Sequence, residues 1–139
     1  MEIFFNGIFQ YKDDVLEYPM LTLAYIGDSV YELFIRSYLV DKTKTTSYEL
    51  HKEAIKYVSA KNQARILCEI NELLTDDEKN IVRRAKNQKT QTLPKNALPE
   101  DYKQATALEA LIGYLYIKKE YERLQTLLEA AAGIQKGTQ

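Results

Sequence analysis

The chain of 139 residues contains one cysteine and one histidine. A lone cysteine, Cys68, excludes an intramolecular disulfide and a cysteine-rich zinc site, and it fits a reducing compartment, so we expect a cytoplasmic protein. A lone histidine, His51, excludes a histidine-rich metal site, and no serine carries the glycine pattern of a nucleophile elbow. We expect His51 on the surface of a helix and Cys68 in the core.

Glycines and long apolar runs are also scarce. There are five glycines and neither a GxGxxG nor a GxxxxGK[ST] pattern, which excludes the usual phosphate-binding loops. The most apolar internal run, 107–117, is interrupted by Glu109, and the N-terminus lacks the basic and apolar regions of a signal peptide. We therefore expect a soluble protein that does not associate with membranes.

The overall composition is that of one globular domain. Hydrophobic residues make up 45% of the chain and charged residues 28%, which is enough apolar material for a core. A length of 139 residues leaves no room for a second module. The net charge of −1 argues against general polyanion binding, so any contact with nucleic acid requires a local basic patch.

The apolar spacing predicts an all-α fold, a compact bundle of about five to seven helices. Residues 21–40 predict one mostly buried helix, with Leu21, Ala24, Tyr25, Asp28, Tyr31 and Ile35 along one side. The patterns TSYE at 46–49 and TDDE at 75–78 have the form of capping boxes, and the first opens a helical segment that runs toward Leu74. Two further helices are predicted over 101–119 and 120–132, and the tyrosines at 25, 31, 114 and 116 are expected to pack in the core or at an interface.

This pattern divides the chain into three parts. Residues 1–18 form an N-terminal extension, in which the pair Asn6-Gly7 leaves a short hairpin and a disordered tail as alternatives. Residues 19–133 form the folded domain, with a loop over 87–100, and residues 134–139 form a polar tail.

Two acids, Asp28 and Glu109, each lie inside an otherwise apolar helical segment. A desolvated carboxylate is costly, so each must be paired, hydrogen-bonded, shifted in pKa or bound to a metal. The small residues Gly27 and Gly113 nearby predict a close approach of the two helices that brings both acids to one point. Ion pairs with local bases such as Arg36 or Lys103 are the alternative. Oxygen-only ligands favour magnesium or manganese over zinc.

The stretch 79–96 contains six basic residues and no acid. Amide and hydroxyl side chains are interleaved with these bases, and such a mixture fits phosphates and 2′-hydroxyls, the groups that duplex RNA presents in its shallow minor groove. A solvated basic face without a ligand is the alternative.

Several segments resemble motifs of one known family. LAYIGDSV at 23–30 resembles the signature helix of ribonuclease III, and LEALIG at 108–113 resembles its second acidic motif. Further matches are LHK at 50–52, VSAK at 58–61, the basic stretch 83–89 and TLPKN at 92–96. Because no double-stranded-RNA-binding domain is present, the chain resembles the bacterial Mini-ribonuclease III family.

This resemblance implies a homodimeric endoribonuclease that cleaves double-stranded RNA, in bacteria the stalk of precursor 23S ribosomal RNA, to 5′-phosphate and 3′-hydroxyl ends. It implies that Asp28 and Glu109 are the catalytic residues and hold Mg²⁺, for which Mn²⁺ is expected to substitute. The predicted RNA contacts are Arg83, Arg84, Lys86, Asn87, Lys89, Thr92, Lys95 and Asn96, together with Lys61 and Lys52.

The sequence departs from full-length ribonuclease III at two positions, where Ala24 and Thr106 replace further acids, as in the Mini family. With fewer acidic ligands, water must fill more of the coordination positions of a bound metal ion. The alternative function is therefore a catalytically inactive module of this type that binds structured RNA or a ribosomal particle. A helical adaptor without an RNA role, in which the two acids are buried ion-pair partners, is a second alternative.

Overall fold

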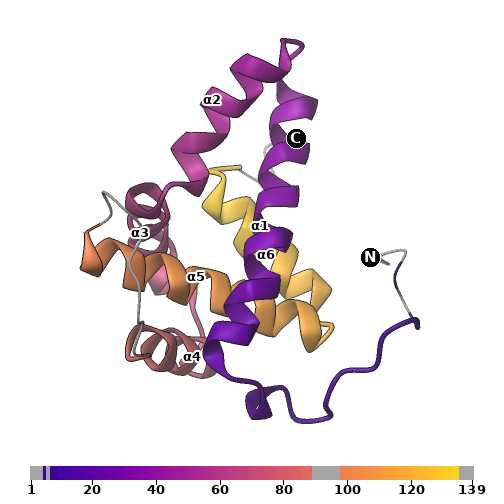
Figure 1. Ribbon diagram of the computed structural model, residues 1–139, viewed down its shortest axis with the longest axis vertical. Helices are drawn as coiled ribbons and strands as arrows, with labels where there is room; N and C mark the ends of the chain where they lie inside the picture. The colour runs from indigo at the N-terminus through magenta and orange to yellow at the C-terminus, as the bar shows by residue number, and fades with distance from the viewer. Residues whose placement is uncertain (1–4, 6, 89–97, 135–139) are drawn as a thin grey trace.

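The computed structural model describes residues 5, 7–88 and 98–134, and within these ranges it contains helices and no strand (Figure 1). The α-helices are α1 (Met20–Lys42), α2 (Ser47–Val58), α3 (Ala60–Ile70), α4 (Asp76–Lys86), α5 (Pro99–Ile117) and α6 (Tyr121–Ala131). Two short 3₁₀ helices, η1 (Val15–Glu17) and η2 (Asn71–Leu73), precede α1 and α4. The predicted all-α class is confirmed.

The helix starts follow local capping. At the start of α4, the Thr75 hydroxyl accepts from the Glu78 amide and the Glu78 carboxylate accepts from the Thr75 amide, which completes the predicted capping box. At the start of α2 only one of these two bonds is present: the Thr46 hydroxyl accepts from the Glu49 amide, so the capping box predicted there is half formed. Pro99 occupies the first turn of α5, so this helix begins two residues before the predicted 101.

The prediction of one continuous segment from Thr46 toward Leu74 was wrong, because the chain breaks at Ser59. Ser59 is extended, with ψ of 151°, and its hydroxyl accepts from the Asn62 amide. One serine thus ends α2 and caps α3, which lets α3 turn and pack on α5.

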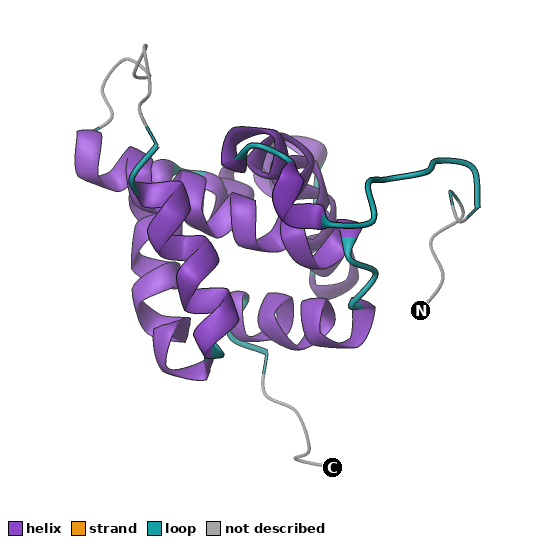
Figure 2. Cartoon of the chain, turned by 90° about the horizontal axis from the view of Figure 1, so that it is seen from below, coloured by secondary structure: helices purple, strands orange, loops and turns teal. Residues whose placement is uncertain are grey.

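At the N-terminus, the Ile8 amide donates to the Phe5 carbonyl at 3.0 Å, and Gly7 has a positive φ of 81°. A turn therefore forms where the hairpin was predicted, although Asn6 lies outside the described residues. No strand follows it in residues 7–19: Figure 2 shows an irregular segment that loops beside the helices, and Val15, Tyr11 and Tyr18 pack against the core.

The core is built around α5, which α1 crosses (Figure 1). Every residue of α5 from Ala105 to Ile117 is buried except Glu109. A Cβ placed on Gly113 would lie 1.9 Å from the Leu23 carbonyl oxygen, and one on Gly27 would lie 1.8 Å from the Glu109 carbonyl oxygen. The predicted close approach is confirmed, and only glycine fits at either position.

Two expectations about side-chain burial were wrong. Helix α1 is not mostly buried: its inner side carries Leu23, Gly27 and Tyr31, while Tyr25 is 82% exposed. Cys68 is exposed rather than in the core, because the buried positions of α3 are 63, 66, 67 and 70, and position 68 points outward from them. His51 is exposed on α2, as predicted.

Helices α4 and α6 are joined by a charged contact that the sequence pattern did not indicate. The Arg123 guanidinium donates to both carboxylate oxygens of Glu78, at 2.7 and 2.8 Å, and the Glu78 side chain is 6% exposed. These bonds and the cap at Thr75 hold the pKa of Glu78 below its usual range despite its burial.

We predict that Gly113→Ala destabilises the protein by about 3 kcal/mol or more, because the added methyl group forces α1 and α5 apart. Urea unfolding monitored by circular dichroism measures this loss. Lys103→Ala, at an exposed position of α5, is the control and should change the unfolding free energy by less than about 0.5 kcal/mol. Equal stabilities of Gly113→Ala and wild type would contradict the tight crossing.

Candidate active site

The crossing of α1 and α5 places the two predicted acids beside each other. Gly27 lies against the backbone of Glu109, and Asp28 is the next residue along α1. The Asp28 side chain is exposed, whereas that of Glu109 is mostly covered. The pair therefore opens to solvent on the Asp28 side and is enclosed on the Glu109 side.

The two carboxyl groups are strongly coupled. Burial, the charge of Asp28 and a side-chain hydrogen bond with Asp28 together raise the pKa of Glu109 to about 8, with a smaller contribution from Glu32. The amide of Gln63 acts in the opposite direction and lowers the Glu109 pKa, because its Nε2 donates to Glu109 Oε2 at 3.5 Å. A cation between the carboxylates would relieve the repulsion that the fold imposes.

Local ion pairs do not account for these acids. Arg36 pairs with Glu32 at 3.1 Å rather than with Asp28, and Lys103 is exposed on α5. Among the described residues, the ion pairs include neither Asp28 nor Glu109. The alternative of buried ion-pair partners is thus contradicted.

The donor set consists of carboxylate oxygens, which suits a hard divalent cation. No group of three or more His, Cys, Asp or Glu side chains is placed to hold a metal within the described ranges. Ala24 and Thr106, which stand where further acids were considered, are both buried. The protein therefore offers two carboxylates, and water would complete the coordination of an ion.

The predicted RNA contacts are only partly gathered in one place. Lys61 on α3 and Lys86 on α4 line a groove of about 590 Å³, together with Arg65 of α3 and with Glu100, Asp101 and Gln104 of α5. Glu109 lies five residues beyond Gln104, about 7.5 Å farther along α5. The groove lies beside the first turns of α5, and neither Glu109 nor Asp28 lines it.

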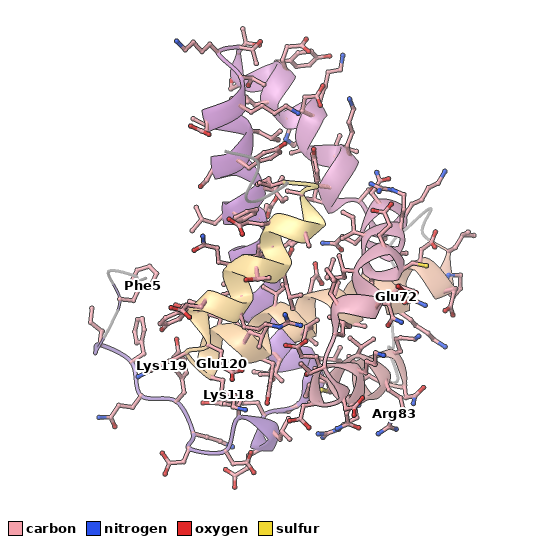
Figure 3. The ribbon with its side chains drawn as sticks, turned by 180° about the vertical axis from the view of Figure 1, so that it is seen from behind. Phe5, Glu72, Arg83, Lys118, Lys119 and Glu120 are labelled. Atoms are coloured by element: carbon pink, nitrogen blue, oxygen red, sulfur yellow. The ribbon has the colours of Figure 1, made fainter. Side chains whose placement is uncertain are left out.

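The remaining basic residues lie around this groove or away from it. Arg84 and Asn87 are on or just after the last turn of α4, and Arg83 is exposed on the outer side of that helix (Figure 3). Lys52 is on α2, with its Nζ 5.6 Å from the centroid of the Tyr48 ring, and does not line the groove. Lys89, Thr92, Lys95 and Asn96 lie outside the described residues.

Comparison with known proteins identifies the family. A model of the ribonuclease III domain matches residues 21–120. The chain belongs to the ribonuclease III family. This membership confirms the resemblance drawn from the signature helix and the second acidic motif, and it confirms the enzyme class, an endoribonuclease of the ribonuclease III type.

Relatives within this family are similar along most of the chain. The Mini-ribonuclease 3 of Thermoanaerobacter sp. is 46% identical over 123 residues, which cover 88% of this chain and 87% of the relative. That of Symbiobacterium thermophilum is 44% identical and covers 84% of this chain and 90% of the relative. A crystal structure of a Fusobacterium nucleatum protein is 35% identical, with a TM-score of 0.78, and covers 88% of this chain and 98% of that one.

Sequence reasoning missed one residue that contacts Glu109, Gln63. Its side chain is 2% exposed and reaches Glu109 from α3. The available signal was a polar residue at a buried position of a helical pattern, followed by Ile66 and Leu67.

The described helices include none that is long and apolar enough to cross a bilayer.

We predict that Glu109→Gln removes a pH dependence of stability in the metal-free protein. The carboxyl titrates near 4.5 when unfolded and at about 8 when folded, so the folded state holds a proton that the unfolded state releases. The stability of wild type should therefore fall as the pH rises from 4.5 to 8. At pH 8 Glu109→Gln should be more stable than wild type by about 1–3 kcal/mol.

Urea unfolding in EDTA between pH 5 and pH 8 measures this difference. The two proteins should be nearly equal at pH 5 and diverge above it. Stability curves that run parallel across this range would show that Glu109 is not held beside Asp28 in a desolvated setting.

Proposed function

We propose that this ribonuclease III family member hydrolyses double-stranded RNA at the Asp28–Glu109 pair with the help of Mg²⁺, leaving 5′-phosphate and 3′-hydroxyl ends. The observation that carries the proposal is the meeting of two acids, distant in sequence, at a point that is open to solvent on one side. The backbone contact at Gly27 keeps the two helices too close for the acids to separate.

The oxygen donors of Asp28 and Glu109 fit Mg²⁺, and Mn²⁺ should substitute for it. When bound, such an ion supplies a water of lowered pKa and neutralises charge on the phosphate. Asp28, which is exposed, faces the side from which RNA arrives. Glu109, which is mostly covered, forms the fixed wall of the site.

The groove at the start of α5, the helix that carries Glu109, supports a duplex substrate. Lys61 and Lys86 approach it from different helices, and neither forms an ion pair within the described residues. We propose that they contact phosphates, with Arg83, Arg84 and Asn87 at the end of α4 and with Lys52 farther out. The same role is proposed for Lys89, Thr92, Lys95 and Asn96. The substrate we propose is precursor 23S ribosomal RNA.

Cleavage of both strands by a single small domain requires two copies, and α1 offers a surface for pairing. Tyr25 is 82% exposed, Leu33 is 67% exposed and Leu21 is 41% exposed, all on the helix that carries Asp28. Exposed apolar side chains of this size are typical of an interface. We therefore propose a homodimer that buries Tyr25, with one acid pair in each subunit.

We predict that Asp28→Asn lowers the rate of cleavage of a long RNA duplex by about 100-fold or more in Mg²⁺, because one of the two ligands loses its charge. Its affinity for the duplex in Ca²⁺ should remain within about twofold of wild type. The matched control is Asp41→Asn, which changes an exposed acid near the end of α1 and should cleave normally.

The same assay separates the alternatives. A purified wild type that leaves the duplex uncut in Mg²⁺ yet binds it would support an inactive RNA-binding module instead. The double variant Arg83→Glu with Arg84→Glu should weaken duplex binding and reduce its salt dependence. An adaptor without an RNA role would show negligible affinity both before and after this change.

We predict that Tyr25→Asp converts a dimer into a monomer, because it places a charge in the apolar contact between two subunits. Light scattering coupled to size-exclusion chromatography measures the molar mass. Tyr48→Asp is the control, since Tyr48 is 69% exposed on α2, and it should remain a dimer. A wild type that is monomeric at micromolar concentration would contradict the proposed dimer.

A further inference from the structure

Gln63 stands out among the buried side chains because it is an amide in an apolar setting. It is 2% exposed and lies on α3 among the core residues Ile66, Leu67 and Ile70. A buried amide is costly unless it is hydrogen-bonded. Its Nε2 donates to Glu109 Oε2 at 3.5 Å, across the packed faces of α3 and α5.

The Glu109 side chain is enclosed by three different helices. Its own backbone on α5 lies against Gly27 of α1, Asp28 approaches from α1, and Gln63 approaches from α3. Asp28 can share a hydrogen bond with Glu109 only while one of the two carboxyls carries a proton, and it repels Glu109 when both are charged. Gln63 is a neutral donor, so its hydrogen bond to Glu109 Oε2 persists when Glu109 is charged.

The Gln63 amide can fix the orientation of the Glu109 carboxylate. A glutamate side chain has three rotatable bonds, and fixing them costs up to about 2 kcal/mol of conformational entropy. A contact of 3.5 Å is longer than an average amide–carboxylate hydrogen bond, so it adds direction more than energy. With Oε2 engaged by Gln63, Oε1 is left for the side of the site where Asp28 lies.

We infer that Gln63 is a positioning residue that orients the Glu109 carboxylate for a divalent cation shared with Asp28. This inference rests on the proposed function, because it assumes that the two acids hold a metal ion. Groups that orient a metal ligand from behind typically change metal affinity or activity by about 10–100-fold when they are removed. Gln63 does not line the groove, so its removal should leave RNA binding unchanged.

The test compares Gln63→Met with wild type in Mn²⁺ binding, measured without RNA from the electron paramagnetic resonance signal of free Mn²⁺. Methionine is similar in length and lacks the donor. We expect the Kd for Mn²⁺ to rise about 10–100-fold. Gln125→Met is the matched control, because Gln125 Nε2 donates to Glu129 Oε2 at 3.3 Å within α6, and it should bind Mn²⁺ like wild type.

Cleavage kinetics give a second readout. The Mn²⁺ concentration for half-maximal cleavage should rise by the same factor in Gln63→Met, while KM for the duplex stays unchanged and saturating Mn²⁺ restores most of the rate. If methionine prevents folding, as judged by circular dichroism, Gln63→Asn keeps the amide but withdraws it by one methylene. It should weaken Mn²⁺ binding in the same direction.

The outcomes separate this inference from the proposed function. A folded Gln63→Met or Gln63→Asn with the wild-type Kd for Mn²⁺, in a protein where Glu109→Gln abolishes binding, would overturn the positioning role alone. A wild type that binds no Mn²⁺, or whose Mn²⁺ binding survives both Asp28→Asn and Glu109→Gln, would overturn the metal site and the inference with it.

Discussion

The contact between the backbones of α1 and α5 is the constraint on which the site depends. Gly27 and Gly113 let the two helices touch, and a side chain at either position would overlap a carbonyl oxygen. Because Asp28 follows Gly27 and Glu109 lies one turn before Gly113, the same contact that closes the core also sets the spacing of the acids. The fold and the chemistry therefore share one structural requirement.

That spacing is electrostatically unfavourable in the absence of a cation. The fold holds a mostly covered glutamate next to a second carboxylate, and burial together with Asp28 raises the pKa of Glu109 to about 8. Two carboxylates held this close together favour the binding of a positive charge at this point of the surface. The groove at the start of α5 carries Lys61 and Lys86 from α3 and α4 and the acids Glu100 and Asp101 from α5.

Much of this could be predicted from the sequence, since apolar periodicity gave the helices and paired small residues indicated the crossing that unites Asp28 with Glu109. The break at Ser59 could not, because a serine is compatible with a helix interior as well as with a cap. The exposure of one side of α1 could not be predicted for another reason. Leu21 and Tyr25 are apolar or aromatic, and in a single sequence such residues cannot be told apart from core residues, even where they lie on a surface that a second subunit could cover. Gln63 belongs to no recognised motif, and its place beside Glu109 is seen only from its burial and its hydrogen bond in the structure.

The central claim, that a helix crossing brings Asp28 and Glu109 together around one hard cation, is tested most directly by anomalous diffraction from crystals soaked in Mn²⁺. The account predicts an anomalous peak within about 2.5 Å of oxygens from both carboxylates, with water completing the coordination. A peak at another place on the surface, or carboxylates that point away from each other with no ion between them, would contradict it.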